Sequence, residues 1–342
     1  MVPPPMTGEL YARCQVWGRF VLRLRSDSST LRNLTDNFRR RTGMGILLDV
    51  ILPVFLVGGC GYLVGRSART DPVVLTRIVF YLLGPALIFR SIYTSTVSFD
   101  SVLSIGVFII LIQGVLFAVS RVVGRVRKWD GDSQAAGSVV LMFANCGNYG
   151  LPVLLFAFGE EGFALGIIYV LISGMMQATL GIGVASWHKG ASWKHGLLQV
   201  LRVPYLYAFL LALLLRSATI ELPQSLFRAV DLLAQAAIPG QLLMLGIQLS
   251  RVRLHHFGVD SIFLSVLKLT IPPILGWAVT SVLGITGLLQ AVLIVEASMP
   301  SAVNALILAT HFRRNVELAA TTVFLSTIMS LVTITVLLSI LR

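Results

Sequence analysis

Two long apolar runs flank the stretch Phe143-Ala144-Asn145-Cys146-Gly147-Asn148-Tyr149-Gly150-Leu151-Pro152. Its two asparagines, two glycines and one proline disfavour a continuous helix. Backbone that leaves the helix inside a membrane must be buried in protein or line a wet cavity, because lipid cannot bond its N–H and C=O groups. The stretch therefore predicts either a helix broken at membrane depth, as in transporter binding sites, or a simple Gly/Pro kink.

The composition is that of an integral membrane protein. The 342 residues are 56% hydrophobic and only 12% charged, with a mean hydropathy of +0.85, whereas a soluble domain carries about 25% charged residues. One span needs about 20 apolar residues, which leaves room for about ten helices in an all-α polytopic membrane protein. The expected spans are residues 44–65, 72–94, 101–123, 134–158, 162–186, 195–216, 226–250, 259–284, 287–310 and 315–341.

Several other classes of function find no support in the residues. Cys14, Cys60 and Cys146 show no metal-ligand spacing and are too few for a disulfide framework. No span carries paired catalytic carboxylates, a metal cluster, or a serine or cysteine beside a histidine, so we expect no catalytic residue, metal or cofactor. The net charge of +12 lies mostly in short loops, without a basic groove interleaved with aromatics, so we expect the lipid bilayer and not nucleic acid as a partner.

The distribution of cations among the loops predicts orientation. Cations gather in the odd-numbered loops, which are therefore expected to be cytoplasmic, at Arg66, Arg69, Arg121, Arg125, Arg127, Lys128, Lys189, Lys194, Arg202, Arg251, Arg253, Arg313 and Arg314. With ten spans, both termini then face away from the cytoplasm. Residues 1–43, with eight arginines and no span-length apolar run, do not fit that side. They are a basic extension that is non-native or disordered, or the span count is off by one.

An internal repeat emerges when the chain is shifted by 153 residues. Asn145 then meets Ser298, Gly147 meets Pro300, and a second polar stretch, residues 296–304, falls on the first. We expect two repeats, residues 44–186 and 195–342, joined by a cytoplasmic linker at 187–194. Five spans per repeat is an odd number, so the two copies should have opposite topology.

Two broken helices in matching positions of inverted halves should cross near the membrane midplane. Their half-helix N-termini would point partial positive charge into one cavity, which suits an anion such as a carboxylate. The expected substrate-binding residues are Asn145, Gly147, Asn148, Ser298, Ser301 and Asn304. The expected helix-breaking residues are Gly150, Pro152 and Pro300, and those expected on the neighbouring spans are Pro85, Pro239 and Gln241. The bland alternative is that the asparagines only cap helix ends and the serines only pack helices.

Two ionisable residues, Glu296 and Lys268, lie deep within expected spans, where charges are costly and usually functional. Each lies about nine residues into its span, and at about 1.5 Å per residue both reach mid-depth. Three interpretations stay open: a structural ion pair, a proton site, and a cation site at Glu296. We favour the ion pair, because two opposite charges most cheaply neutralise each other.

The chain resembles the auxin efflux carrier family over about residues 44–342. The resemblance is carried by Asn-x-Gly-Asn-x-Gly-Leu-Pro at 145–152, by Met-Pro-Ser-Ala-Val-Asn at 299–304 and by Phe324-Leu325-Ser326-Thr327. It implies a fold similar to the bile-acid sodium symporters, with a scaffold of spans 1, 2, 6 and 7 and a moving transport domain of spans 3–5 and 8–10. It also implies elevator-like alternating access and often a homodimer. The long central loop of many plant members is absent, as in the bacterial type.

The sequence thus predicts a secondary transporter of a small organic anion in the cell membrane, coupled to H⁺ or Na⁺ or to neither. One alternative is a membrane sensor that binds the anion without transporting it. A second alternative is a sodium-coupled symporter of the bile-acid type.

Overall fold

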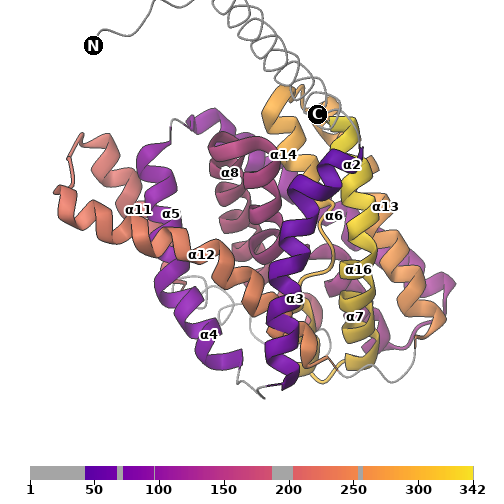
Figure 1. Ribbon diagram of the computed structural model, residues 1–342. Helices are drawn as coiled ribbons and strands as arrows, with labels where there is room; N and C mark the ends of the chain where they lie inside the picture. Colours follow the sequence, from indigo (N-terminus) through magenta and orange to yellow (C-terminus); the bar gives the residue numbers. More distant parts are fainter. Residues whose placement is uncertain (1–42, 68–71, 96, 187–202, 253–256, 342) are drawn as a thin grey trace, which may run out of the picture.

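The protein is an all-α bundle in a computed structural model that describes residues 43–67, 72–95, 97–186, 203–252 and 257–341 (Figure 1). In chain order, with η marking short π-helical turns, its elements are α2 (Gly43–Ile46), η1 (Leu47–Ile51), α3 (Leu52–Ser67), α4 (Pro72–Ile78), η2 (Val79–Leu83), α5 (Gly84–Thr94), α6 (Phe99–Val126), α7 (Gly131–Met142), η3 (Cys146–Gly150), α8 (Leu151–Met176), η4 (Gln177–Gly181), α9 (Ile182–Ala185), α11 (Pro204–Ser217), α12 (Gln224–Ser250), α13 (Val259–Val282), α14 (Gly287–Ala297), α15 (Val303–His311) and α16 (Val316–Leu341). Of the expected basic extension, only Gly43 is among these residues, and the expected linker at 187–194 lies outside them.

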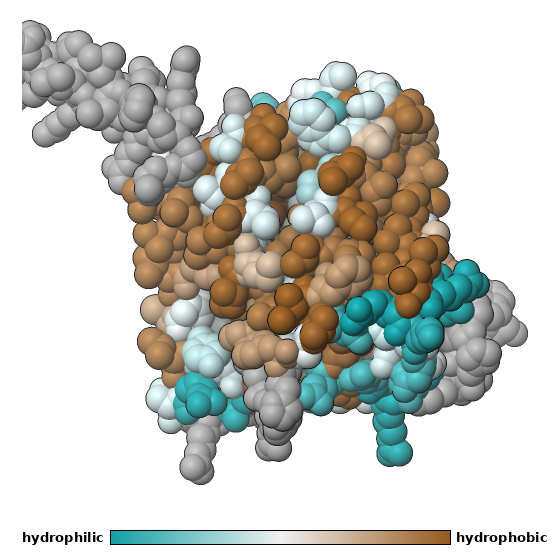
Figure 2. All heavy atoms as spheres, turned by 90° about the vertical axis from the view of Figure 1, so that its right-hand side faces the viewer, coloured by the Kyte–Doolittle hydropathy of each residue, from teal (hydrophilic) through white to brown (hydrophobic). Residues whose placement is uncertain are grey.

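The molecule is a multi-pass membrane protein. Seven helices of the described chain are long and apolar enough to cross a bilayer, and α11 and α14 are shorter apolar helices. Hydrophobic side chains cover most of the height of one face, and hydrophilic ones gather at its lower end (Figure 2). The end of α2 and the last turns of α16 lie at the opposite, upper end (Figure 1). The count of ten spans and the side on which the termini lie stay predictions.

One apolar segment, Cys146–Ala185, is 40 residues long, about twice the length that a bilayer requires. It folds back at Gly159, whose φ of 67° and ψ of −162° leave the helical region. A Cβ built on Gly166 would lie 3.2 Å from a methyl carbon of Leu151, although fifteen residues of straight helix would separate the two by about 22 Å. The left-handed φ at this turn suits glycine, which has no Cβ to clash.

The helices pack in two groups. One group holds α3, α4, α5, α11 and α12, with α12 packed along α3 and α5. The other group holds α6, α7, α8, α13, α14, α15 and α16. Figure 1 shows α4, α5, α11 and α12 toward one side and α7, α13 and α16 toward the other. These are the helices expected as scaffold and transport domain; whether one group moves against the other stays a prediction.

Candidate functional site

The two polar stretches form two helix breaks that lie side by side. α7 ends at Met142 and η3 begins at Cys146, whereas α14 ends at Ala297 and α15 begins at Val303. Between them, Ala144 and Ser301 form an isolated antiparallel bridge. The amide of Asn145 donates to the carbonyl of Pro300 at 2.8 Å, and the amide of Ala302 donates to that of Phe143 at 3.0 Å. Each break therefore satisfies backbone groups of the other, which lipid could not do.

The first break lies earlier than expected, at residues 143–145. Gly150 and Pro152, expected to break the helix, instead lie in η3 and in the first turn of α8. The expectation for these two residues was wrong because proline is well tolerated in a helix's first turn, where its missing N–H has no intrahelical partner anyway. Pro300 does lie in the non-helical stretch of the second break.

Serines hold the two breaks in place. The hydroxyl of Ser301 donates to the carbonyl of Val140 at 2.9 Å, and its amide donates to the hydroxyl of Ser326 at 3.1 Å. The hydroxyl of Ser298 donates to the carbonyl of Ile294 at 2.6 Å. All three serines are buried. Ser298 and Ser301 thus serve the backbone in this conformation, and each keeps only acceptor capacity for a ligand.

The asparagines differ from the serines because their side-chain amides are not used in hydrogen bonds to the described residues. Asn145 is buried, yet its Nδ2 has no hydrogen-bond partner within the described chain. Asn148 is half-buried, and its side chain likewise makes no hydrogen bond to the described residues. Gly147 is half-buried between them, and Asn304 is exposed on the first turn of α15. A buried donor left unpaired is costly, so the Nδ2 of Asn145 stands out among the polar groups at the two breaks.

The neighbouring group of helices reaches this place through α12, which packs against η3. Gln241 on α12 is buried, and its Oε1 has no partner among the described residues. Pro239 is exposed inside α12, and Pro85 is half-buried near the start of α5. The sequence did not single out Tyr149, which packs edge to face on Phe55 of α3 and hydrogen-bonds to Ser330 at 3.0 Å.

Glu296 lies at the C-terminal end of α14, just before the second break. Its side chain reaches η3, the helical turn that follows the first break. It is fully buried, and both carboxylate oxygens lack a hydrogen-bond partner in the described chain. A Cβ on Gly150 would clash with Oε2, and one on Gly166 would lie 3.2 Å from Oε1. The thiol of Cys146 lies 3.8 Å from the backbone carbonyl oxygen of Glu296. Two glycines therefore make the slot that holds this carboxylate.

The expected ion pair between Glu296 and Lys268 is not formed. Lys268 is buried, and its Nζ donates to the carbonyl of Leu141 at 3.1 Å, near the C-terminal end of α7. The helix breaks explain the difference, because each creates helix ends with partial charges. The ammonium takes the negative end of α7, and the carboxylate lies beside the opening turn of η3. No group of three or more histidine, cysteine or acidic side chains that could hold a metal ion occurs in the described ranges.

Comparisons with known proteins agree with this architecture. A family described as membrane transport proteins matches residues 46–196 and 191–338. The chain belongs to this family. It is the auxin efflux carrier family that the motif at 145–152 resembles.

Curated relatives of the chain are named as transporters and not as enzymes. An uncharacterized transporter of Methanothermobacter thermautotrophicus is 31% identical over 84% of this chain and 95% of its own. An uncharacterized transporter of Methanocaldococcus jannaschii is 30% identical over 84% of this chain and 97% of its own. A putative malonate transporter of Rhizobium meliloti is 25% identical over 87% of this chain and 97% of its own. As a member of this family, the protein is a membrane transporter.

Proposed function

We propose that the protein is a secondary carrier of a small organic anion and that the carboxylate binds at the paired breaks. The observation that carries the proposal is the buried Nδ2 of Asn145, which has no partner in the described chain and lies where two helices are interrupted together. An amide donor facing a carboxylate forms a charge-assisted hydrogen bond, which is stronger than a neutral one.

The polarity of the site supports an anion over a cation or a neutral solute. Two helix N-termini, of η3 and α15, open at the breaks and bring partial positive charge. Asn145 and Asn148 both present amide donors there. The relative named as a putative malonate transporter supports the same class, because malonate is a small dicarboxylate.

Alternating access would come from the two groups of helices moving as bodies. Both breaks and the bonds that join them lie in one group, while Gln241 stands on the other. Movement of the group that carries the breaks past α12 would therefore carry the substrate site with it. This movement would change the side of the membrane from which the site is reached.

Glu296 supports proton coupling over sodium coupling. A dry carboxylate with no partner is accommodated most cheaply as the neutral acid. A tight sodium site would surround the ion with oxygen ligands, whereas Gly150 and Gly166 lie beside the carboxylate of Glu296, and neither of its oxygens has a hydrogen-bond partner among the described residues. We therefore infer that a proton is taken up and released at Glu296 during transport.

Uptake into proteoliposomes tests the carrier function. Vesicles holding the purified protein should accumulate radiolabelled malonate with saturation, and unlabelled small carboxylates should compete. An imposed pH gradient should increase uptake, and a sodium gradient should not. Malonate binding without any flux would favour the sensor alternative, and stimulation by sodium alone would favour the symporter alternative.

A further inference from the structure

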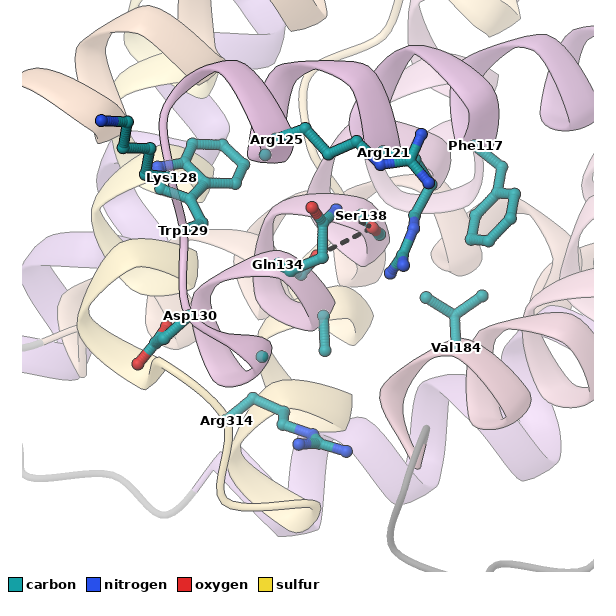
Figure 3. Close-up of a pocket in the computed structure, with 13 residues that line it drawn as sticks. Phe117, Arg121, Arg125, Lys128, Trp129, Asp130, Gln134, Ser138, Val184 and Arg314 are labelled. Atoms are coloured by element: carbon teal, nitrogen blue, oxygen red, sulfur yellow. Dashed lines mark hydrogen bonds between the residues drawn. The ribbon is translucent and has the colours of Figure 1, made fainter.

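A second polar site lies at the basic end of the bundle, away from the paired breaks. A cavity of about 420 Å³ opens there between the end of α6, the start of α7, α9 and the turn between α15 and α16 (Figure 3). None of the residues 143–145 or 298–302 lines it. Its wall is made by Phe117, Arg121, Gly124, Arg125, Lys128, Trp129, Asp130, Gly131, Gln134, Ala135, Ser138, Val184 and Arg314.

Basic side chains approach this cavity from two sides. Arg121 and Arg125 are four residues apart on α6, which places them on one face of the helix. Lys128 lies beyond the end of α6, where its φ of 55° leaves the right-handed helical region. Figure 3 shows Arg121 and Arg125 on one side of the cavity and Arg314 across from them. Neither Arg125 nor Lys128 has an acidic partner within the described chain. Guanidinium groups converging from opposite walls match the oxygens of a phosphate group.

The opposite wall is built and held in place. The side chain of Arg314 is 5% exposed, pairs with Asp132 at 2.6 Å and donates to the carbonyl of Ala185 at 2.6 Å. Arg314 thereby ties the second half of the chain to α7 and α9 of the first. A buried arginine fixed from two directions presents its charge with little loss of side-chain freedom on ligand binding.

One of the described residues in the wall is acidic. Asp130 caps α7 by accepting a hydrogen bond from the amide of Ser133 at 2.8 Å, and hydrogen bonds from the Ser133 side chain and then from this amide lower the pKa of the Asp130 carboxyl. Among the described residues that line the cavity, four are cationic, namely Arg121, Arg125, Lys128 and Arg314, and one is acidic, namely Asp130, while Asp132 pairs with Arg314 beside it.

The deep side of the cavity is partly apolar. Gln134 donates to the carbonyl of Ser120 at 3.0 Å and to the hydroxyl of Ser138 at 3.1 Å, so these polar groups are already paired. Phe117 and Val184 form the apolar part of the wall, and Phe117 lies one turn deeper along α6 than Arg121. Charge at the helix ends with apolar surface one turn deeper is the polarity of a lipid headgroup region.

We propose that this cavity binds the phosphate group of an anionic phospholipid headgroup. The lipid phosphate lies between the arginines of α6 and Arg314, with its glycerol end toward Phe117. The helices that line the cavity belong to the group that carries the paired breaks or, in the case of α9, pack against its members α7 and α15. A bound headgroup would therefore contact α6 and α7 from the first half of the chain and Arg314 from the second half, and would stabilise their packing at this end of the bundle.

Lipid binding to the purified full-length protein tests this proposal. Native mass spectrometry and thermal unfolding in detergent would be compared with phosphatidylglycerol, phosphatidylcholine and inorganic phosphate. The test variant is Arg121→Gln with Arg125→Gln. The control is Arg66→Gln with Arg77→Gln, which removes the same charge from two exposed arginines outside the cavity. We expect phosphatidylglycerol to bind the natural chain and the control alike, and the test variant at least about tenfold more weakly.

Three results would overturn the proposal. These are equal phosphatidylglycerol binding by the test variant and the natural chain, an equal loss in the control, and inorganic phosphate binding as tightly as the lipid. The last result would identify a soluble phosphate as the ligand. If the double variant does not fold, Arg125→Gln carries the comparison alone, because Arg125 is exposed and its replacement should leave the fold intact.

Discussion

Replacing Glu296 by glutamine separates a structural ion pair from a proton site. The side-chain amide of glutamine has nearly the same shape as the carboxylic acid of glutamate, but it cannot ionise. Both oxygens of Glu296 lack a partner in the described chain, and Lys268 is bonded to Leu141 instead. Replacing an unpartnered neutral acid by an amide of the same size exchanges one unsatisfied polar group for another. We expect the free energy of unfolding to fall by less than about 1 kcal/mol.

A buried ion pair would behave differently. Removing one partner strands the other charge and typically costs about 3–5 kcal/mol. The contrast is sharpest in a double-mutant cycle that adds Lys268→Met. That single change removes the donor to the carbonyl of Leu141 and should cost about 1–3 kcal/mol by itself. Without a pair, the two costs should add with a coupling energy below about 1 kcal/mol.

Two assays carry the experiment. Thermal unfolding of the purified variants reports stability, and malonate uptake into proteoliposomes reports coupling. Glu296→Gln should fold, exchange external for internal malonate, and lose the stimulation by a pH gradient. A variant that loses several kcal/mol and regains it with Lys268→Met would refute the reasoning and restore the ion pair. A stable variant that still responds to the pH gradient would remove Glu296 from the coupling mechanism.

The remaining predictions address the binding site, the carboxylate slot and the basic extension. Asn145→Ala removes an amide donor worth about 1–3 kcal/mol to a charged ligand, so malonate should bind about 5- to 150-fold more weakly in a calorimetric titration. The melting temperature of this variant should change little because Nδ2 has no hydrogen-bond partner among the described residues; the reverse pattern would show a purely capping role. Gly150→Ala should lower stability by about 1–3 kcal/mol through its clash with Glu296. The control Gly174→Ala, with open space around its Cβ, should be neutral or should stabilise the helix by about 0.5–1 kcal/mol in the same unfolding assay. Deletion of residues 1–43 should leave membrane insertion and uptake intact, and loss of a folded product would show that the segment is structural.

The sequence predicted both interruptions because their residue types disfavour helix wherever they occur. It placed the first one several residues late. Proline and glycine suggest a break at their own positions, whereas Pro152 begins a helix and Gly150 makes room for a carboxylate. That second role depends on the approach of α14 to η3, which no local pattern encodes. The same limit explains the wrong ion pair, since equal depth in the membrane says nothing about contact.

For the site residues too, the residue type predicts some roles, whereas other roles depend on contacts between distant segments. Asparagines in a polar stretch within an apolar run indicate a functional place, and the Nδ2 of Asn145 has no hydrogen-bond partner among the described residues. The serines of the second stretch resemble them in sequence, yet the hydroxyl of Ser301 donates to the carbonyl of Val140 and has no proton left to donate to a substrate in this arrangement. Whether a hydroxyl serves the backbone or a ligand depends on the carbonyls that the other break leaves open. Only the pairing of the two breaks determines that.

The pairing also limits how transport could occur. The bonds from Asn145 to Pro300, from Ala302 to Phe143 and from Ser301 to Val140 all lie within one group of helices. Sliding one break along the other would expose several backbone groups to an apolar medium, each at a cost of a few kcal/mol. No backbone hydrogen bond joins η3 to α12 among the described residues, and the Oε1 of Gln241 on α12 has no partner there either. Under the proposed function, the surface that slips is therefore the one along α12, and the two breaks travel together with the anion between them.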